Sequence, residues 1–162
     1  MNEKTYAALG VAGPLTAYAF IAISIALFPG FSWERNALSD LGHYTRSPVA
    51  PIFNLGLFSS GFLMIVYSIK AFGKTARCTS LCLIAASLTL QLVAVFNEAY
   101  GFLHYTVSVL FFASIGVASL VYAREGKSFL AAAAFAIGLI SWVIYWMRIF
   151  SIGVLFPKPS HQ

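Results

Sequence analysis

The chain has 162 residues, of which 60% are hydrophobic and 9% are charged, with a formal net charge of +5. A soluble domain carries roughly 25% charged residues because its surface faces water, so this composition excludes an ordinary soluble globular protein. The positive net charge does not indicate a nucleic-acid partner, because no basic cluster is interleaved with aromatic residues. It fits the sorting of positive charges at membrane surfaces and contact with anionic lipids.

Charged residues divide the chain into long uncharged runs, which cover residues 5–33, 47–69, 78–97, 99–123 and 128–147. Each run reaches the roughly 20 residues that a helix needs to cross about 30 Å of hydrocarbon. A helix also satisfies its own backbone hydrogen bonds in lipid. The sequence therefore predicts an all-α, polytopic transmembrane helix bundle with five spans, at 6–29, 52–71, 78–97, 103–123 and 128–150.

We expect one transmembrane helical domain over residues 1–156 and a disordered tail over 157–162. The first apolar run exceeds the roughly 7–15 residues of a signal-peptide core, which favours a retained helix. Helices in hydrocarbon associate through small residues. We therefore expect two close-approach faces, Ser114, Gly116, Ala118 and Ser119 in the fourth span and Ala131–Ala134, Ala136 and Gly138 in the fifth.

The distribution of Lys and Arg predicts the orientation. Six lie on the side of the N-terminus and four on the other: Lys4, Lys70, Lys74, Arg77, Arg124 and Lys127 against Arg35, Arg46, Arg148 and Lys158. Positive residues are enriched in cytoplasmic loops. We therefore predict a cell-membrane protein with a cytoplasmic N-terminus, and with the first loop and the C-terminus outside.

The connection between the first two spans, residues 30–51, is long and contains Asp40 and His43, which belong to residue types that are rare in this chain. Residues 31–41 are expected to form a short interfacial helix that Gly42 ends in the left-handed conformation. In one interpretation Ser39 and Asp40 bond nearby backbone groups and tie the loop down. In the other, Asp40 faces a pocket.

Polar residues also gather at one level of the spans. Gln91, Glu98, His104, Tyr145 and Arg148 all fall in the outer half of the bundle or at its outer rim under the predicted topology. Ionisable groups near a membrane are costly unless they pair or face a cavity, so they are candidates for a functional site. A structural ion pair between Glu98 and Arg148 is the alternative.

The sequence thus predicts an outward-facing polar pocket. The candidate catalytic residues are Asp40, Glu98 and His104. The candidate binding residues are Arg148, Asn36, Ser39, His43, Gln91 and Tyr145. No spacing matches a known metal-ligand motif, and we expect neither a metal nor another cofactor.

Two stretches resemble a known family. Asn36–Gly42 after the first span resembles the N-x-x-S-D-L-G signature of an uncharacterised archaeal and bacterial multi-pass membrane family, domain of unknown function 998. The sequence F-N-E at 96–98, followed by H-Y at 104–105 and F-F at 111–112, resembles the family's F-P-E and H-Y…F-F motifs. Asn97 stands where the family has proline, and the family usually has six spans.

The resemblance implies that Asp40, Glu98 and His104 matter, without implying a reaction. A looser similarity of the loop and of the Glu and His that follow extends to Frag1/DRAM/Sfk1-type membrane proteins. Some of those proteins are connected with lipid remodelling of anchored proteins.

Three functions remain open. The first is the binding or chemistry of lipid headgroups, with acid–base groups in the pocket and Arg148 holding a phosphate. The second is a non-catalytic subunit or scaffold that associates through its helices with itself or with other membrane subunits. The third, a small-solute or proton transporter, is less favoured because the cytoplasmic halves of the spans contain few polar residues. The expected partners are membrane lipids and membrane helices.

Overall fold

The computed structural model describes the backbone of residues 2–155 and the side chains of residues 2–144 and 147. In this part of the chain the α-helices are α1 (Glu3–Leu27), α2 (Ala50–Lys70), α3 (Arg77–Val95), α4 (Phe102–Glu125) and α5 (Phe129–Leu155). Three connections contain short 3-10 helices, η1 (Leu38–Gly42), η2 (Phe72–Lys74) and η3 (Glu98–Tyr100). The described residues include four helices long and apolar enough to cross a membrane, followed by the shorter apolar stretch Phe129–Ile144 of α5. The predicted all-α membrane bundle is confirmed.

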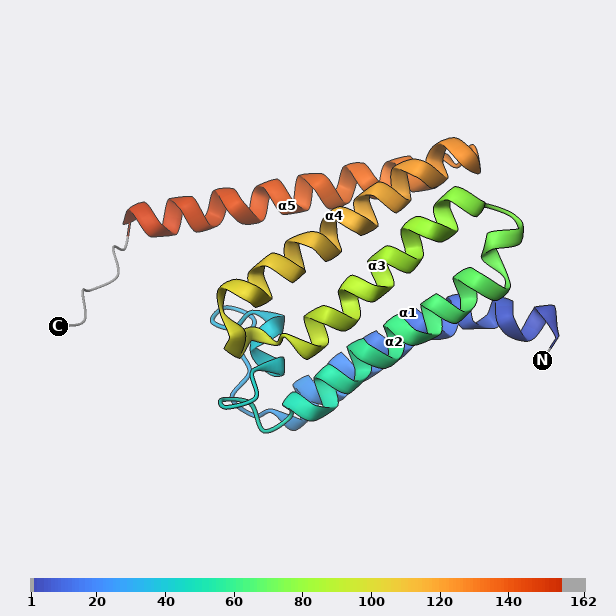
Figure 1. Cartoon of the computed structure of the whole chain (residues 1–162). Helices are drawn as coiled ribbons and strands as arrows, with labels where there is room; N and C mark the ends of the chain where they lie inside the picture. The colour runs from blue at the N-terminus through green and yellow to red at the C-terminus, as the bar shows by residue number, and fades with distance from the viewer. Residues whose placement is uncertain (1, 156–162) are drawn as a thin grey trace.

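Each helix packs against the next one in the sequence, so the chain runs up and down through the bundle (Figure 1). The α1–α2 loop and the α3–α4 turn lie at one end. The N-terminus and the other two turns lie at the opposite end. The polar segments around η1 and η3 are therefore neighbours in space, although almost 60 residues separate Asp40 from Glu98. The predicted tail at 157–162 lies outside the described residues.

Polar caps fix where two of the helices begin. The Asn2 side chain accepts a hydrogen bond from the backbone N–H of Thr5 at 2.9 Å, which caps α1. The carboxylate of Glu125, the last residue of α4, accepts from the backbone N–H groups of Cys78 at 3.0 Å and Thr79 at 2.8 Å. These N–H groups have no partner within their own helix, so Glu125 both caps α3 and ties it to α4.

Glycine allows α1 and α2 to approach closely. A Cβ atom on Gly56 of α2 would lie 2.1 Å from the Cβ of Phe20 on α1, and one on Gly13 would lie 2.8 Å from the Met64 side chain. A Cβ atom is fixed to the backbone, so the Phe20 contact cannot be relieved by a rotamer change. The separation of these two helices therefore depends on Gly56.

Between α4 and α5 the two glycines of the expected close-approach faces differ. A Cβ on Gly116 would lie 3.4 Å from the Phe135 ring, an ordinary van der Waals contact. A Cβ on Gly138 would meet no described atom within 4 Å, so the expected close approach is wrong at this residue. The physical reason is that Gly138 borders a cavity toward the end of the bundle that carries the first loop.

The first loop contains a short helix, as predicted, but the expected bounds and ending are wrong. Only Leu38–Gly42 is helical, and it forms a 3-10 helix in place of a helix over 31–41. The Asn36 side chain accepts from the backbone N–H of Ser32 at 3.0 Å, which holds the preceding residues in a turn.

Gly42 does not have the positive φ that was expected; among the described glycines Gly101, at the start of α4, has it. Gly42 is required for another reason. A Cβ there would lie 2.7 Å from Oδ1 of Asn54, whose Nδ2 donates a 3.0 Å hydrogen bond to the Gly42 carbonyl. The glycine therefore allows the loop to contact α2 directly.

Gly56→Ala is expected to lower the free energy of unfolding by about 1–3 kcal/mol, because overpacking forces α1 and α2 apart. The control is Gly138→Ala, which adds the same methyl group in open space and raises helix propensity by up to about 1 kcal/mol. Unfolding of both variants in detergent measures the difference. Equal stability of the two variants would show that the Gly56 contact does not set the helix separation.

Candidate functional site

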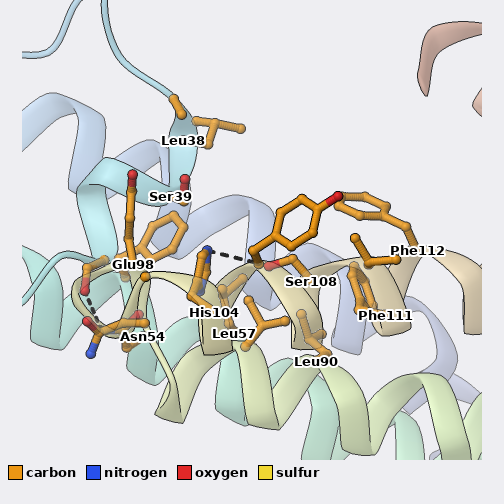
Figure 2. Close-up of a pocket in the computed structure, with 18 of the residues that line it drawn as sticks. Leu38, Ser39, Asn54, Leu57, Leu90, Glu98, His104, Ser108, Phe111 and Phe112 are labelled. Carbon is orange, nitrogen blue, oxygen red and sulfur yellow. Dashed lines mark hydrogen bonds between the residues drawn. The ribbon is translucent and has the colours of Figure 1, made fainter. Parts of the chain in front are cut away.

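A cavity of about 970 Å³ lies at the end of the bundle that carries the first loop. Residues of η1, α2, α3, η3, α4 and α5 line it, so segments from most of the chain meet there. Its polar side chains include Ser39, Asn54, Glu98 and His104. Figure 2 shows Glu98 beside Ser39 at one end, and Phe111 and Phe112 at the other. The cavity is therefore amphipathic along its length.

The α3–α4 turn presents Glu98 to the cavity. The Asn97 side chain caps η3 by accepting from the backbone N–H of Ala99 at 3.2 Å, and Gly101 with φ +56° turns the chain into α4. The Oε2 atom of Glu98 is buried and has no hydrogen-bond partner among the described residues. A buried acceptor without a partner is unfavourable, because it has lost its water and gained nothing in exchange.

Burial raises the pKa of the Glu98 carboxyl above its ordinary value of 4.5. A hydrogen bond with the Ser39 side chain opposes this shift, and the negative charge of Asp40 adds to it. The positive form of His104 would favour an ionised Glu98. These effects place Ser39, Asp40 and His104 around Glu98, so the structure brings the three candidate catalytic residues into one neighbourhood.

His104 is held in a defined orientation. Its Nδ1 lies 2.8 Å from the carbonyl oxygen of Phe96, and since a carbonyl can only accept, Nδ1 carries the proton. In the neutral ring Nε2 is then an acceptor, and it lies 3.4 Å from the Ser108 hydroxyl. Both His104 and Ser108 line the cavity, and the Ser108 hydroxyl is the described partner of Nε2.

Asp40 has the geometry of a loop clamp. Its Oδ2 accepts from the Asn36 side-chain amide and from the backbone N–H of Ala37, both at 3.0 Å. Ser39, Leu38 and Ala37 line the cavity, whereas Asp40 is not among the described lining residues. Asp40 thus fixes the loop that carries Ser39, and a catalytic role for it stays a prediction.

Three candidate binding residues have partners elsewhere. Asn36 bonds within the loop, as above, and Nδ1 of the buried His43 lies 3.1 Å from the Thr45 hydroxyl. Gln91 donates from Nε2 to the Phe58 carbonyl at 3.3 Å, which links α3 to α2. None of the three is among the described residues that line the cavity.

Two candidate binding residues lie in α5, but Tyr145 and Arg148 have side chains outside the described part of the structure. The suggested ion pair between Glu98 and Arg148 therefore stays a prediction. Where side chains are described, no three His, Cys, Asp or Glu residues are grouped so that they could hold a metal ion.

Sequence reasoning missed the apolar wall of the cavity, which includes Leu57, Leu90, Phe111, Phe112 and Trp142. In a membrane protein an apolar residue gives no sign of whether it faces lipid, a neighbouring helix or a cavity. The one available signal was the F-F pair at 111–112, which appears in the family resemblance without a stated role.

Asp40→Ala removes both hydrogen bonds of the clamp and is expected to lower the free energy of unfolding by about 1–3 kcal/mol. Asp40→Asn retains an acceptor oxygen and is expected to cost less. Unfolding in detergent, with limited proteolysis of the 30–49 loop, measures both effects. An Asp40→Ala variant as stable and as resistant to protease as the wild type would contradict the clamp.

Glu98 is expected to make stability depend on pH. Its pKa is raised above 4.5 in the folded protein, so the folded state holds the proton more tightly than the unfolded chain. Stability contributed by the neutral carboxyl is present below pH 4.5 and is lost as the pH rises through the raised pKa. The Glu98→Gln variant should lack this decline.

The measurement is the melting temperature of delipidated protein in detergent, from below pH 4.5 to neutral pH. Glu34→Gln, which removes an exposed carboxylate of the same loop region outside the cavity, is the control and should follow the wild type. Parallel curves for the wild type and Glu98→Gln would show that the Glu98 carboxyl does not influence folding.

Comparison with known families gives one finding. A family described as "Protein of unknown function (DUF998)" matches residues 11–158. No curated protein and no solved structure matches the chain. The looser similarity to Frag1/DRAM/Sfk1-type proteins stays a prediction. Because the match covers most of the sequence and the described helices are apolar and long enough to span a membrane, the chain belongs to the DUF998 family of multi-pass membrane proteins of unknown function.

Proposed function

We propose that this protein binds one amphipathic lipid molecule in the cavity. The headgroup lies at the polar end, between η1 and η3, and an acyl chain lies along the apolar wall. The observation that carries this proposal is the arrangement in Figure 2, where Glu98, Ser39 and His104 stand at one end and Phe111 and Phe112 at the other.

The size and composition of the cavity support a lipid ligand. Its volume of about 970 Å³ lies at the upper end of the roughly 300–1,000 Å³ that small-molecule sites occupy. Such sites are mostly apolar with a few polar groups that fix orientation. A water-soluble solute would leave much of the apolar wall without a matching surface, whereas an acyl chain covers it.

The polar end of the cavity is proposed to face the outer leaflet of the cell membrane. The turns at the opposite end carry Lys70, Lys74, Arg77, Arg124 and Lys127. Positive residues are enriched on the cytoplasmic side, which supports a cytoplasmic N-terminus and an outer position for the η1–η3 end. A headgroup bound there lies at the level where the outer-leaflet headgroups lie.

Binding is favoured over chemistry as the primary role. Asp40, the third candidate catalytic group, accepts at Oδ2 from Asn36 and Ala37 and is not among the described lining residues, which supports a structural role for it. Acid–base catalysis needs a group within hydrogen-bond reach of the proton it moves. Glu98 and His104 remain as the groups that contact the ligand.

The test fills the cavity from α5. Gly138 lines the cavity, and a Cβ atom there would meet no described atom within 4 Å, so Gly138→Phe is chosen to place a ring in the lipid site. An overpacking penalty of about 1–3 kcal/mol corresponds to roughly a ten- to a hundredfold loss of affinity. We expect the lipid that co-purifies with the protein, quantified by mass spectrometry of the extract, to fall accordingly.

Two controls accompany this variant. Gly138→Ala adds no bulk and should keep its lipid, and Leu139→Phe places the same ring on a neighbouring, 48% exposed position outside the cavity. Unchanged lipid content in folded Gly138→Phe would refute the proposal and favour the scaffold, which associates through its helices and does not need the cavity.

A further inference from the structure

We infer that the polar end of the cavity selects a lipid headgroup that carries a primary ammonium group. This inference rests on the proposed lipid site and names the chemistry of the ligand. It follows from the hydrogen-bonding groups at that end, which include a buried carboxylate oxygen without a partner among the described residues.

The first acceptor is the Glu98 carboxylate. Its Oε2 atom is buried without a partner among the described residues, and Glu98 lines the cavity. A ligand N–H group would satisfy this oxygen. If the donor is charged, the hydrogen bond is shorter and roughly twice as strong as one between neutral groups.

The second acceptor is Nε2 of His104. The ring donates its one proton from Nδ1 to the Phe96 carbonyl, so Nε2 is an acceptor, and its described contact is a long one of 3.4 Å to the Ser108 hydroxyl. Figure 2 shows the ring close to Glu98. An ammonium group has three N–H donors, enough in number for both acceptors.

The charges around the cavity also favour a cation. No Lys or Arg is among the described residues that line it, and the negative charge of Asp40 acts on Glu98. A bare phosphate would meet a carboxylate there and no positive partner among the described lining residues. The wall includes the aromatic rings of Tyr105 and Trp142, and aromatic faces attract cations.

The test compares three lipids with identical short acyl chains: phosphatidylethanolamine, phosphatidylcholine and phosphatidic acid. Each is titrated into delipidated full-length protein in detergent, and native mass spectrometry measures its dissociation constant. Phosphatidylethanolamine is expected to bind at least about tenfold more tightly than the other two, the ratio that one charge-assisted hydrogen bond supplies. Phosphatidylcholine tests whether the N–H groups are needed, because its ammonium has none.

In Glu98→Gln the ratio of the dissociation constants of the other lipids to that of phosphatidylethanolamine should fall to about one, because the substitution retains the shape of the side chain and removes its charge. Glu34→Gln is the matched control at the same end of the bundle and should keep the preference. If Glu98→Gln does not fold, Glu98→Asp retains the charge on a shorter side chain and should keep a weaker preference. Equal or tighter binding of phosphatidic acid by the wild type, or an unchanged preference in folded Glu98→Gln, would overturn the inference.

The two proposals fail in different ways. If Gly138→Phe loses lipid binding but the wild type shows no headgroup preference, the lipid site is supported and the ammonium selectivity is refuted. If Gly138→Phe binds lipid as the wild type does, both the lipid site and its selectivity are refuted.

Discussion

The contact between Gly42 and Asn54 determines how the first loop covers the end of the bundle. The absence of a side chain on Gly42 lets its carbonyl accept from Asn54 on α2, and the preceding Leu41 is completely buried in the core with Phe53 and Leu57. Backbone in a membrane protein is irregular only where other protein groups satisfy its polar atoms. Because the loop is anchored at this point, Ser39 is held at the mouth of the cavity and opposite η3.

A second constraint is electrostatic. The cavity places one partly buried carboxyl, Glu98, between a second carboxylate and a largely apolar wall. Such an environment disfavours the charged form, and a cationic or donor-bearing ligand reverses that effect. The loop clamp at Asp40 and the Glu98 carboxyl are therefore coupled through their charges, although Asp40 is not among the described lining residues.

The fold was largely predictable because few kinds of structure satisfy a backbone in lipid. Predicted spans such as 52–71 and 103–123 agree with α2 (Ala50–Lys70) and α4 (Phe102–Glu125) within about two residues, the usual uncertainty of helix ends. The site was harder to predict. Polar residues at one level were visible, yet Gln91 and His43 shared that level and bond to Phe58 and Thr45, away from the cavity. Sequence spacing places a residue along a helix, and the packing of neighbouring helices decides which face is enclosed.

The sequence by itself determined that the chain is a multi-span helical membrane protein and that Asn36–Gly42 and Glu98 fall at the same end of it. Composition and the length of the apolar runs suffice for these two conclusions. The bilayer thickness sets the length of each span, and consecutive spans cross it in opposite directions, so every second connection lies on the same side. Only the tertiary structure decided that Asp40 clamps the loop, that Nδ1 of His104 bonds to the Phe96 carbonyl, and that a Cβ on Gly138 would meet no described atom within 4 Å. Those features depend on distances of a few ångströms between segments far apart in the chain, and hydropathy carries no information about such distances.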